Sequence, residues 1–253
     1  MSLHVDRTGS GPDLVLLHGW GLHSGAWDGA IALLAARFRV HALDLPGHGL
    51  SATMPAASFE QAVEAVADAI PRDSLVCGWS LGGLFAQRLA RDHPDRVRAL
   101  ALVGATPCFV ERDGWPAAMK ASTFGEFESG LATDLDATLA RFVRLAALNG
   151  TDSRAAIRIL ARQLGERGMP QGAGLARALG WLRDTDLRDD ARRLEQAAVV
   201  IHGRGDSLAP IEAGRWLAAA LPNARLVELE DCSHLPFLSH RGAFVQALES
   251  LHG

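Results

Sequence analysis

Short apolar runs alternate with amphipathic segments along most of the chain. The apolar runs have the length of buried strands, and they cover residues 14–17, 38–43, 75–77, 97–103, 198–203 and 224–229. Between them, apolar residues recur three and four positions apart, as in residues 59–70, which is the spacing of a helix packed on one side. Strands that alternate with helices predict an α/β fold, with a mostly parallel central sheet flanked by helices on both faces.

The alternation stops between about residues 107 and 190. This stretch contains no convincing strand, but it has helical patterns at residues 117–127, 135–148, 153–167 and 174–182, the last two separated by the glycine-rich residues 168–172. We therefore predict a core made of residues 1–106 and 191–253, and an all-helical cap, residues 107–190, inserted between two strands. A cap over the strand ends encloses a substrate pocket and excludes water from it.

A strand-turn-helix junction carries the first chemical signal. Gly78-Trp79-Ser80-Leu81-Gly82 is a G-x-S-x-G pattern that follows the apolar run 75–77 and precedes an amphipathic segment. In this setting the pattern predicts a nucleophile elbow, in which Ser80 is strained and its hydroxyl is exposed above the sheet edge. The alternative is an ordinary glycine-rich helix start with Ser80 as its N-cap.

A nucleophilic serine needs a base that takes its proton and an acid that orients the base. Asp206 and His234 each follow a predicted strand, and the order serine, acid, histidine is that of an α/β hydrolase. Alone, His234 would be a surface or capping histidine, but together with Ser80 and Asp206 it is a candidate catalytic base. Asp231 is the second candidate acid, although it is too near His234 to come from a separate strand end, and Asp44 is a weaker one.

An oxyanion hole is predicted where the strand 14–17 ends in His18-Gly19-Trp20-Gly21. The backbone N–H groups of Trp20 and Leu81 would together hold the oxyanion of a tetrahedral intermediate. We interpret His18 as a residue that braces this loop by hydrogen bonding rather than as a catalytic residue.

Composition excludes several classes of protein. The chain of 253 residues has the size of a single α/β domain, and its formal net charge of −4 gives no general attraction to nucleic acid. Residues 1–13 lack the layout of a signal peptide, and no apolar run approaches the length of a membrane span. We therefore expect a soluble, cytoplasmic protein that does not associate with membranes.

Cysteine and histidine spacing argues against disulfides and metals. The three cysteines, Cys77, Cys108 and Cys232, fit a reducing compartment and the role of small buried hydrophobes. Cys77 and Cys232 are close in sequence to candidate catalytic residues, which would make an enzyme sensitive to thiol reagents. The ten histidines form no H-x-x-x-H or H-E-x-x-H pair, so we expect no metal site and no cofactor.

The predicted cap is rich in arginine: Arg141, Arg144, Arg154, Arg158, Arg162 and Arg167. Three of these, at positions 154, 158 and 162, recur every fourth residue and so form one basic stripe on a helix. The stripe is either a solvated helix face or a docking site for an acidic partner, because a surface of one sign attracts the opposite charge.

The whole chain resembles the α/β-hydrolase superfamily, and it is most similar to the pimeloyl-[acyl-carrier protein] methyl ester esterases of biotin synthesis. The resemblance is carried by residues 16–22, 44–49, 78–84 and 141–142, and by Pro107-Cys108-Phe109, Arg112-Asp113 and Trp115-Pro116 at the start of the cap. Trp20 and Trp79, together with the start of the cap, distinguish this family from other members of the superfamily.

The resemblance implies a monomeric serine carboxylesterase that hydrolyses a methyl ester carried on acyl carrier protein. It implies a triad of Ser80, Asp206 and His234, an oxyanion hole at Trp20 and Leu81, an acyl channel lined by Phe142, Val143 and Ala146, and carrier docking by Arg141, Arg154 and Arg158. Ala137 stands where the family would have a further docking arginine. Two alternatives stay open: a general short-chain carboxylesterase or enol-lactonase, and a non-catalytic ligand-binding protein of the same fold.

Overall fold

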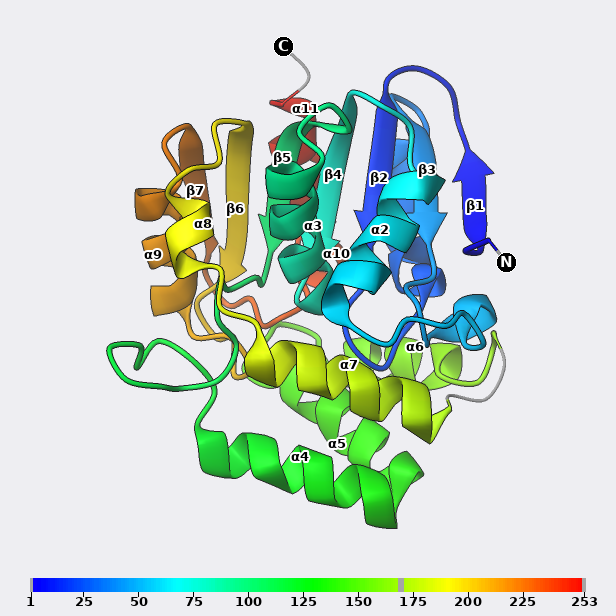
Figure 1. The fold of residues 1–253 in the computed structure, drawn as a ribbon, viewed down its shortest axis with the longest axis vertical. Helices are drawn as coiled ribbons and strands as arrows, with labels where there is room; N and C mark the ends of the chain where they lie inside the picture. The colour runs from blue at the N-terminus through cyan, green and yellow to red at the C-terminus, as the bar shows by residue number, and fades with distance from the viewer. Residues whose placement is uncertain (1, 168–170, 252–253) are drawn as a thin grey trace.

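A computed structural model describes residues 2–167 and 171–251, and a seven-stranded sheet forms its centre (Figure 1). The strands are β1 (Val5–Thr8), β2 (Asp13–Leu17), β3 (Arg39–Leu43), β4 (Ser74–Trp79), β5 (Val97–Val103), β6 (Ala197–Gly203) and β7 (Ala224–Leu229). Their order is β1-β3-β2-β4-β5-β6-β7, and every neighbouring pair is parallel except β1 with β3. The predicted α/β fold with a mostly parallel sheet is confirmed.

The central strands are buried along almost their whole length because helices cover both faces of the sheet. Every residue of β4 is buried. Figure 1 shows α2 (Phe59–Ala69) and α3 (Leu81–Asp92) in front of the sheet and α11 (Arg241–Glu249) behind it. Each leucine or valine buried between these layers stabilises the fold by roughly 1.5–3 kcal/mol. The remaining helices of the core are η1 (Ser24–Trp27), α1 (Asp28–Leu34), η2 (Gly49–Ser51), α9 (Ile211–Ala220) and α10 (Pro236–Ser239).

The chain between β5 and β6 is helical. It contains α4 (Ala121–Thr133), α5 (Leu135–Ala147), α6 (Ser153–Gln163), α7 (Gly172–Asp184) and α8 (Arg188–Ala191). Figure 1 shows α4 to α7 beyond the carboxyl ends of the strands, whereas α8 lies beside the sheet and packs against α3. The predicted boundary at residue 190 therefore falls inside α8, on the side of the core.

Several element boundaries differ from the sequence predictions. The helix predicted at 117–127 is α4, which begins at Ala121, because the N–H of Met119 pairs with the carbonyl of Phe109 and holds that segment extended. Helix α6 ends at Gln163, before the predicted 167, and residues 168–170 of the predicted break lie outside the described residues. Strand β1 was not predicted, because an edge strand whose only apolar residue is Val5 has no hydrophobic pattern.

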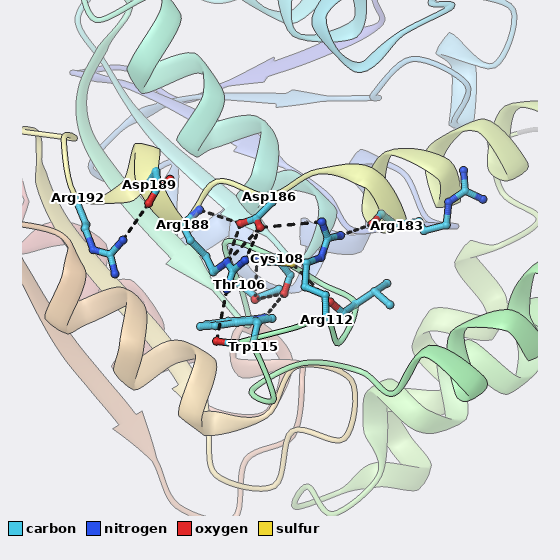
Figure 2. A network of polar contacts seen from close by, with 11 residues as sticks. Thr106, Cys108, Arg112, Trp115, Arg183, Asp186, Arg188, Asp189 and Arg192 are labelled. Atoms are coloured by element: carbon cyan, nitrogen blue, oxygen red, sulfur yellow. Dashed lines mark hydrogen bonds and ion pairs between the residues drawn. The ribbon is translucent and has the colours of Figure 1, made fainter.

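The two connections of the helical segment meet in a polar network (Figure 2). Asp186 accepts hydrogen bonds from Arg188, with a shortest distance of 2.7 Å, and it lies 3.9 Å from Arg112. Arg112 in turn donates to the carbonyl oxygen of Arg183 at 2.6 Å. The Arg112-Asp113 and Trp115-Pro116 motif therefore joins the incoming connection of the cap to the outgoing one.

Candidate active site

Ser80 lies at the turn between β4 and α3 in a backbone conformation that is rare for a residue with a side chain. Its φ is 53° and its ψ is −114°. The turn is tight, because a Cβ atom built on Gly78 would lie 2.2 Å from the carbonyl oxygen of Gly82. The N–H of Ser80 donates to the carbonyl of Val103 at 3.0 Å, which ties the turn to the neighbouring strand. Strain of this kind is found where a side chain must point away from both elements, as at a nucleophile elbow.

His234 and Asp206 are joined by a hydrogen bond. Nδ1 of His234 lies 2.7 Å from Oδ2 of Asp206, and the other carboxylate oxygen accepts from the backbone N–H groups of Leu208 and Ala209, both at 2.9 Å. The carboxylate makes Nδ1 the protonated nitrogen of a neutral imidazole, so Nε2 is left as the basic atom. Nε2 of His234 and Oγ of Ser80 are both buried, and neither has a hydrogen-bond partner among residues 2–167 and 171–251.

Asp206 is ionised in this setting. Burial by itself would raise its pKa, but the charge and hydrogen bond of His234, together with His202 and the N–H of Ala209, outweigh burial and hold the pKa of Asp206 below its usual value. An anionic acceptor can orient the imidazole of His234 and stabilise the charge that the ring gains when it accepts a proton.

Gly104 and Trp79 hold the His234–Asp206 pair in place, and the sequence did not identify either of them in this role. Gly104 has a φ of +49°, and a Cβ atom there would lie 2.8 Å from Nδ1 of His234 and 3.3 Å from Oδ2 of Asp206. The indole N–H of Trp79 donates to the carbonyl of His234 at 2.9 Å. The position of Gly104, directly after β5, was the available signal, but its neighbours depend on the order of the strands.

The two alternative acids lie in other surroundings. Asp44 accepts from the backbone N–H groups of Ser24 at 2.7 Å and Leu50 at 2.8 Å, so it fixes two loops. The backbone carbonyl of Asp231 accepts from the N–H of Thr151 at 2.8 Å, and the side chain of Asp231 is exposed. Neither carboxylate forms a hydrogen bond with His234, which pairs with Asp206.

His18 braces the loop that contains Trp20. Its Nδ1 lies 2.8 Å from the carbonyl of Gly19, and its Nε2 accepts from the N–H of Leu45 at 2.9 Å. Burial and the neighbouring His48 lower the pKa of His18 to about 3, so the ring is neutral and serves as donor and acceptor at once.

The backbone amides of Trp20 and Leu81 are free donors, and that of Leu81 directly follows Ser80. Leu81 is the first residue of α3, where an N–H has no intrahelical acceptor. Within the part of the chain that the structure describes, neither amide donates to another residue. The side chain of Trp20 is fixed separately, since its indole N–H donates to the carbonyl of Leu175 in α7 at 2.9 Å.

An apolar cavity adjoins Trp20 between the core and the helical segment. In this closed arrangement its volume is only about 10 Å³, and it is lined by Trp20, Phe109, Met119, Phe124, Phe127, Phe142, Leu179 and Leu182. Phe142 thus lies where the resemblance implies an acyl channel. Val143 and Ala146 are buried but do not line this cavity. A space with this lining suits a hydrocarbon chain and offers no partner for a charge.

The helical segment closes over the candidate residues. Only 3% of Ser80 and none of His234 is exposed. The carbonyl of Ala146 accepts from the N–H of His234 at 3.1 Å, and the carbonyl of Gln163 lies 2.6 Å from Nε2 of His23. A substrate reaches Ser80 only when this segment moves.

The candidate docking arginines differ in their surroundings. Arg154 and Arg158 are exposed, and neither pairs with any described residue. Arg162 lies 3.0 Å from Glu166. Arg141 is paired with Glu126, and its guanidinium lies 5.1 Å from the centre of the Phe127 ring, so its charge is partly compensated within the protein.

The three cysteines are free and buried. Burial raises the pKa of Cys77, and it raises the pKa of Cys232 to about 11. Across residues 2–167 and 171–251, no group of three His, Cys, Asp or Glu side chains is arranged to hold a metal ion. No helix in the same ranges is long and apolar enough to cross a membrane.

Comparison with known proteins identifies the class. A family model described as the alpha/beta hydrolase fold matches residues 12–241, so the chain belongs to the α/β hydrolases. An esterase from Exiguobacterium antarcticum has the same fold, with a TM-score of 0.90 over 99% of this chain and 96% of that one, at 23% sequence identity.

Within this class, two relatives are much closer in sequence. The pimeloyl-[acyl-carrier protein] methyl ester esterase of Nitrosomonas europaea is 45% identical over 251 residues, which is 99% of each chain. The protein of the same name from Chromobacterium violaceum is 43% identical, over 98% of this chain and 97% of that one. The chain belongs to the pimeloyl-[acyl-carrier protein] methyl ester esterase family.

Proposed function

We propose that this protein is a serine carboxylesterase that converts the methyl ester of pimeloyl-[acyl-carrier protein] to pimeloyl-[acyl-carrier protein] and methanol, a step in biotin synthesis. The observation that carries the proposal is the 45% identity, along 99% of both chains, to the N. europaea protein of that name. The hydrogen bond between His234 and Asp206, the strained Ser80 and the two free amides support it.

The mechanism is acyl transfer in two steps. Nε2 of His234 takes the proton of Ser80 while Oγ attacks the ester carbonyl carbon, and the amides of Trp20 and Leu81 donate to the oxyanion. The bond to the methoxy oxygen then breaks, and His234 returns the proton so that methanol leaves. Water attacks the acyl-enzyme with His234 as base, which frees the carboxylate and Ser80. One oxyanion donor lowers the barrier by about 3 kcal/mol, and Asp206 stabilises the imidazolium.

The substrate lies with its ester at Ser80 and its methylene chain beside Trp20 and Phe142, where the apolar cavity widens as the helical segment moves. The lining of that cavity supports this placement, because each buried methylene contributes about 0.8 kcal/mol. Val143 and Ala146 stay proposed substrate contacts, reached when the helical segment has moved.

A fluorophosphonate probe and a Ser80→Ala variant test the catalytic assignment. The wild type should be labelled on Ser80, and Ser80→Ala should lose both labelling and ester hydrolysis while its thermal unfolding is unchanged. Near-normal turnover by Ser80→Ala would exclude the mechanism. A folded wild-type protein that is not labelled would instead favour a non-catalytic ligand-binding protein.

The substrate is tested separately. We propose that Arg141, Arg154 and Arg158 contact the acidic carrier protein, because Arg154 and Arg158 are exposed and unpaired, and exposed charges of one sign attract and steer an acidic surface. Hydrolysis of pimeloyl methyl ester on acyl carrier protein should be compared with that of free dimethyl pimelate and a p-nitrophenyl ester. Arg154→Glu/Arg158→Glu should lower activity on the carrier-bound ester alone, and high salt should have the same effect.

A matched control comes from the amino ends of the strands, on the side of the sheet away from the helical segment. Arg37 and Arg72 are exposed and precede the amino ends of β3 and β4, so Arg37→Glu/Arg72→Glu makes the same change of net charge away from the helical segment. Equal activity of wild type and both variants on all three esters would favour a general short-chain carboxylesterase or enol-lactonase. We also propose that the protein is a monomer located in the cytoplasm. Its three free, buried cysteines fit that reducing compartment.

A further inference from the structure

A second buried histidine, His202, lies behind the carboxylate of Asp206. It is part of β6 and is completely buried. Its Nε2 lies 2.8 Å from the carbonyl oxygen of Ala209 and 3.5 Å from Oδ2 of Asp206. Because a carbonyl oxygen only accepts, the proton of this ring is on Nε2. The same N–H therefore borders the carboxylate oxygen that accepts from His234.

The surroundings of His202 leave its ring one position. Gly214 of α9 packs against the other edge, where a Cβ atom would lie 2.5 Å from Nδ1 and 2.7 Å from Cγ of the ring. Nδ1 has no hydrogen-bond partner in the described part of the chain. The absence of a side chain at Gly214 thus lets the Nδ1 edge of the ring approach the helix, while the Nε2 edge borders Asp206.

His202 acts on Asp206 as a neutral dipole. Burial lowers its pKa, although the nearby Asp206 opposes this, so the ring carries no charge near neutral pH. The other titratable groups that face this pair are His234, Glu212 of α9 and Cys232 in the loop before His234. Among the described residues, His234 makes the one side-chain hydrogen bond to Oδ2, and the N–H of His202 donates to Ala209.

We propose that His202 is a positioning residue for Asp206, whose Nε2–H holds the carbonyl of Ala209 and, at 3.5 Å from Oδ2, moderates the attraction of the carboxylate for His234. The inference rests on the proposed catalytic triad. Without this N–H, the buried carboxylate is less compensated, so it holds the protonated imidazole more strongly. Ser80 then becomes reactive only at a higher pH.

Two substitutions of His202 by side chains of similar size distinguish the effect of its N–H group from the effect of its volume. The amide nitrogen of His202→Gln is as many bonds from Cα as Nε2 of histidine, whereas His202→Met fills similar space without a donor. The readout is the pH dependence of the rate at which a fluorophosphonate labels Ser80. We expect the midpoint of the acidic limb to rise by about 0.5 pH unit in His202→Met and to stay near the wild-type value in His202→Gln.

A third variant changes the ring position from the other side. Gly214→Ala places a methyl group 2.5 Å from Nδ1 of His202, which forces the ring to move, and thermal unfolding checks that the variant is folded. The acidic limb of Gly214→Ala should shift in the same direction as that of His202→Met.

Each outcome bears on one claim. Labelling profiles of His202→Met and Gly214→Ala that overlay the wild type would overturn the role of His202 and leave the proposed function intact. Equal shifts in His202→Gln and His202→Met would also overturn it, because packing alone would explain them. A wild type that is labelled but ignores the carrier-bound ester would refute the proposed substrate only, and one that is not labelled would refute both proposals.

Discussion

Replacing Gly104 by alanine should separate the chemistry of the candidate site from its stability. The new Cβ atom would lie 2.8 Å from Nδ1 and 3.0 Å from Cε1 of His234. Atoms in contact are normally about 3.5–4.0 Å apart, so the ring must move by roughly 0.5–1 Å. A displacement of this size in a catalytic group costs on the order of 10²-fold in rate, which corresponds to about 2.7 kcal/mol in the barrier.

Gly114→Ala is the matched control for the backbone. Gly104 and Gly114 have φ values of +49° and +69°, and a side chain in this region costs roughly 1–2 kcal/mol at either position. The nearest atom to a Cβ on Gly114 is 4.0 Å away, on Arg188. Both variants should therefore unfold at lower temperatures, Gly104→Ala more so because its methyl group also crowds the buried His234, and only Gly104→Ala should lose activity.

The assay is kcat for a p-nitrophenyl ester, with the active fraction counted by fluorophosphonate labelling, alongside thermal unfolding of both variants. The reasoning predicts a loss on the order of 10²-fold for Gly104→Ala relative to Gly114→Ala. If the two variants differ by less than about threefold in kcat, the contact between Gly104 and the His234–Asp206 pair does not control the reaction.

Two further predictions concern pH and thiol reagents. Burial lowers the pKa of His48 from 6.5 to about 4. Between these two pH values the unfolded chain binds a proton at His48 that the folded chain does not. The free energy of unfolding should therefore be highest above pH 6.5 and fall on the order of 3 kcal/mol by about pH 4. Urea unfolding at several pH values should show this slope in the wild type and a shallower slope in His48→Asn, and equal slopes would exclude His48 as its source. The sequence suggested sensitivity to thiol reagents, but Cys77 and Cys232 are buried and their pKa values are raised. Iodoacetamide should therefore leave esterase activity unchanged at pH 8. Rapid inactivation, with mass added to either cysteine, would contradict this prediction.

The pairing of Asp206 with His234 was predictable because each follows an apolar strand. Strands β6 and β7 are parallel neighbours, so their carboxyl ends, and the loops that follow, meet at one edge of the sheet. The strained turn at Ser80 was predictable because a G-x-S-x-G pattern between a strand and a helix has few structural uses. In each case a local sequence pattern and the direction of the strand were sufficient to predict where the residue lies in the fold.

Contacts across the sheet were not predictable from local patterns. Gly104 meets His234 because β5 lies between β4 and β6. The contact of His202 with Asp206, four residues along the chain, depends on Gly214 of α9, which packs against the other edge of the ring. The start of α4 was wrong for a similar reason: the alanine-rich residues before it favour a helix, but backbone pairing of Met119 with Phe109 keeps them extended.

The helical segment and the chemistry are coupled through two backbone carbonyls. Ala146 accepts from the N–H of His234, and Leu175 accepts from the indole of Trp20. Opening the segment breaks both hydrogen bonds, at a net cost of about 1 kcal/mol each.

Under the proposed function, the acyl chain of the substrate favours reclosure of the helical segment once it has entered. Each methylene that the closed segment buries contributes about 0.8 kcal/mol, which adds to the two hydrogen bonds that reform. A short ester buries less and stabilises the closed arrangement less. Chain length should therefore affect kcat as well as KM, because the same closure that binds the chain restores the contacts of His234 and Trp20.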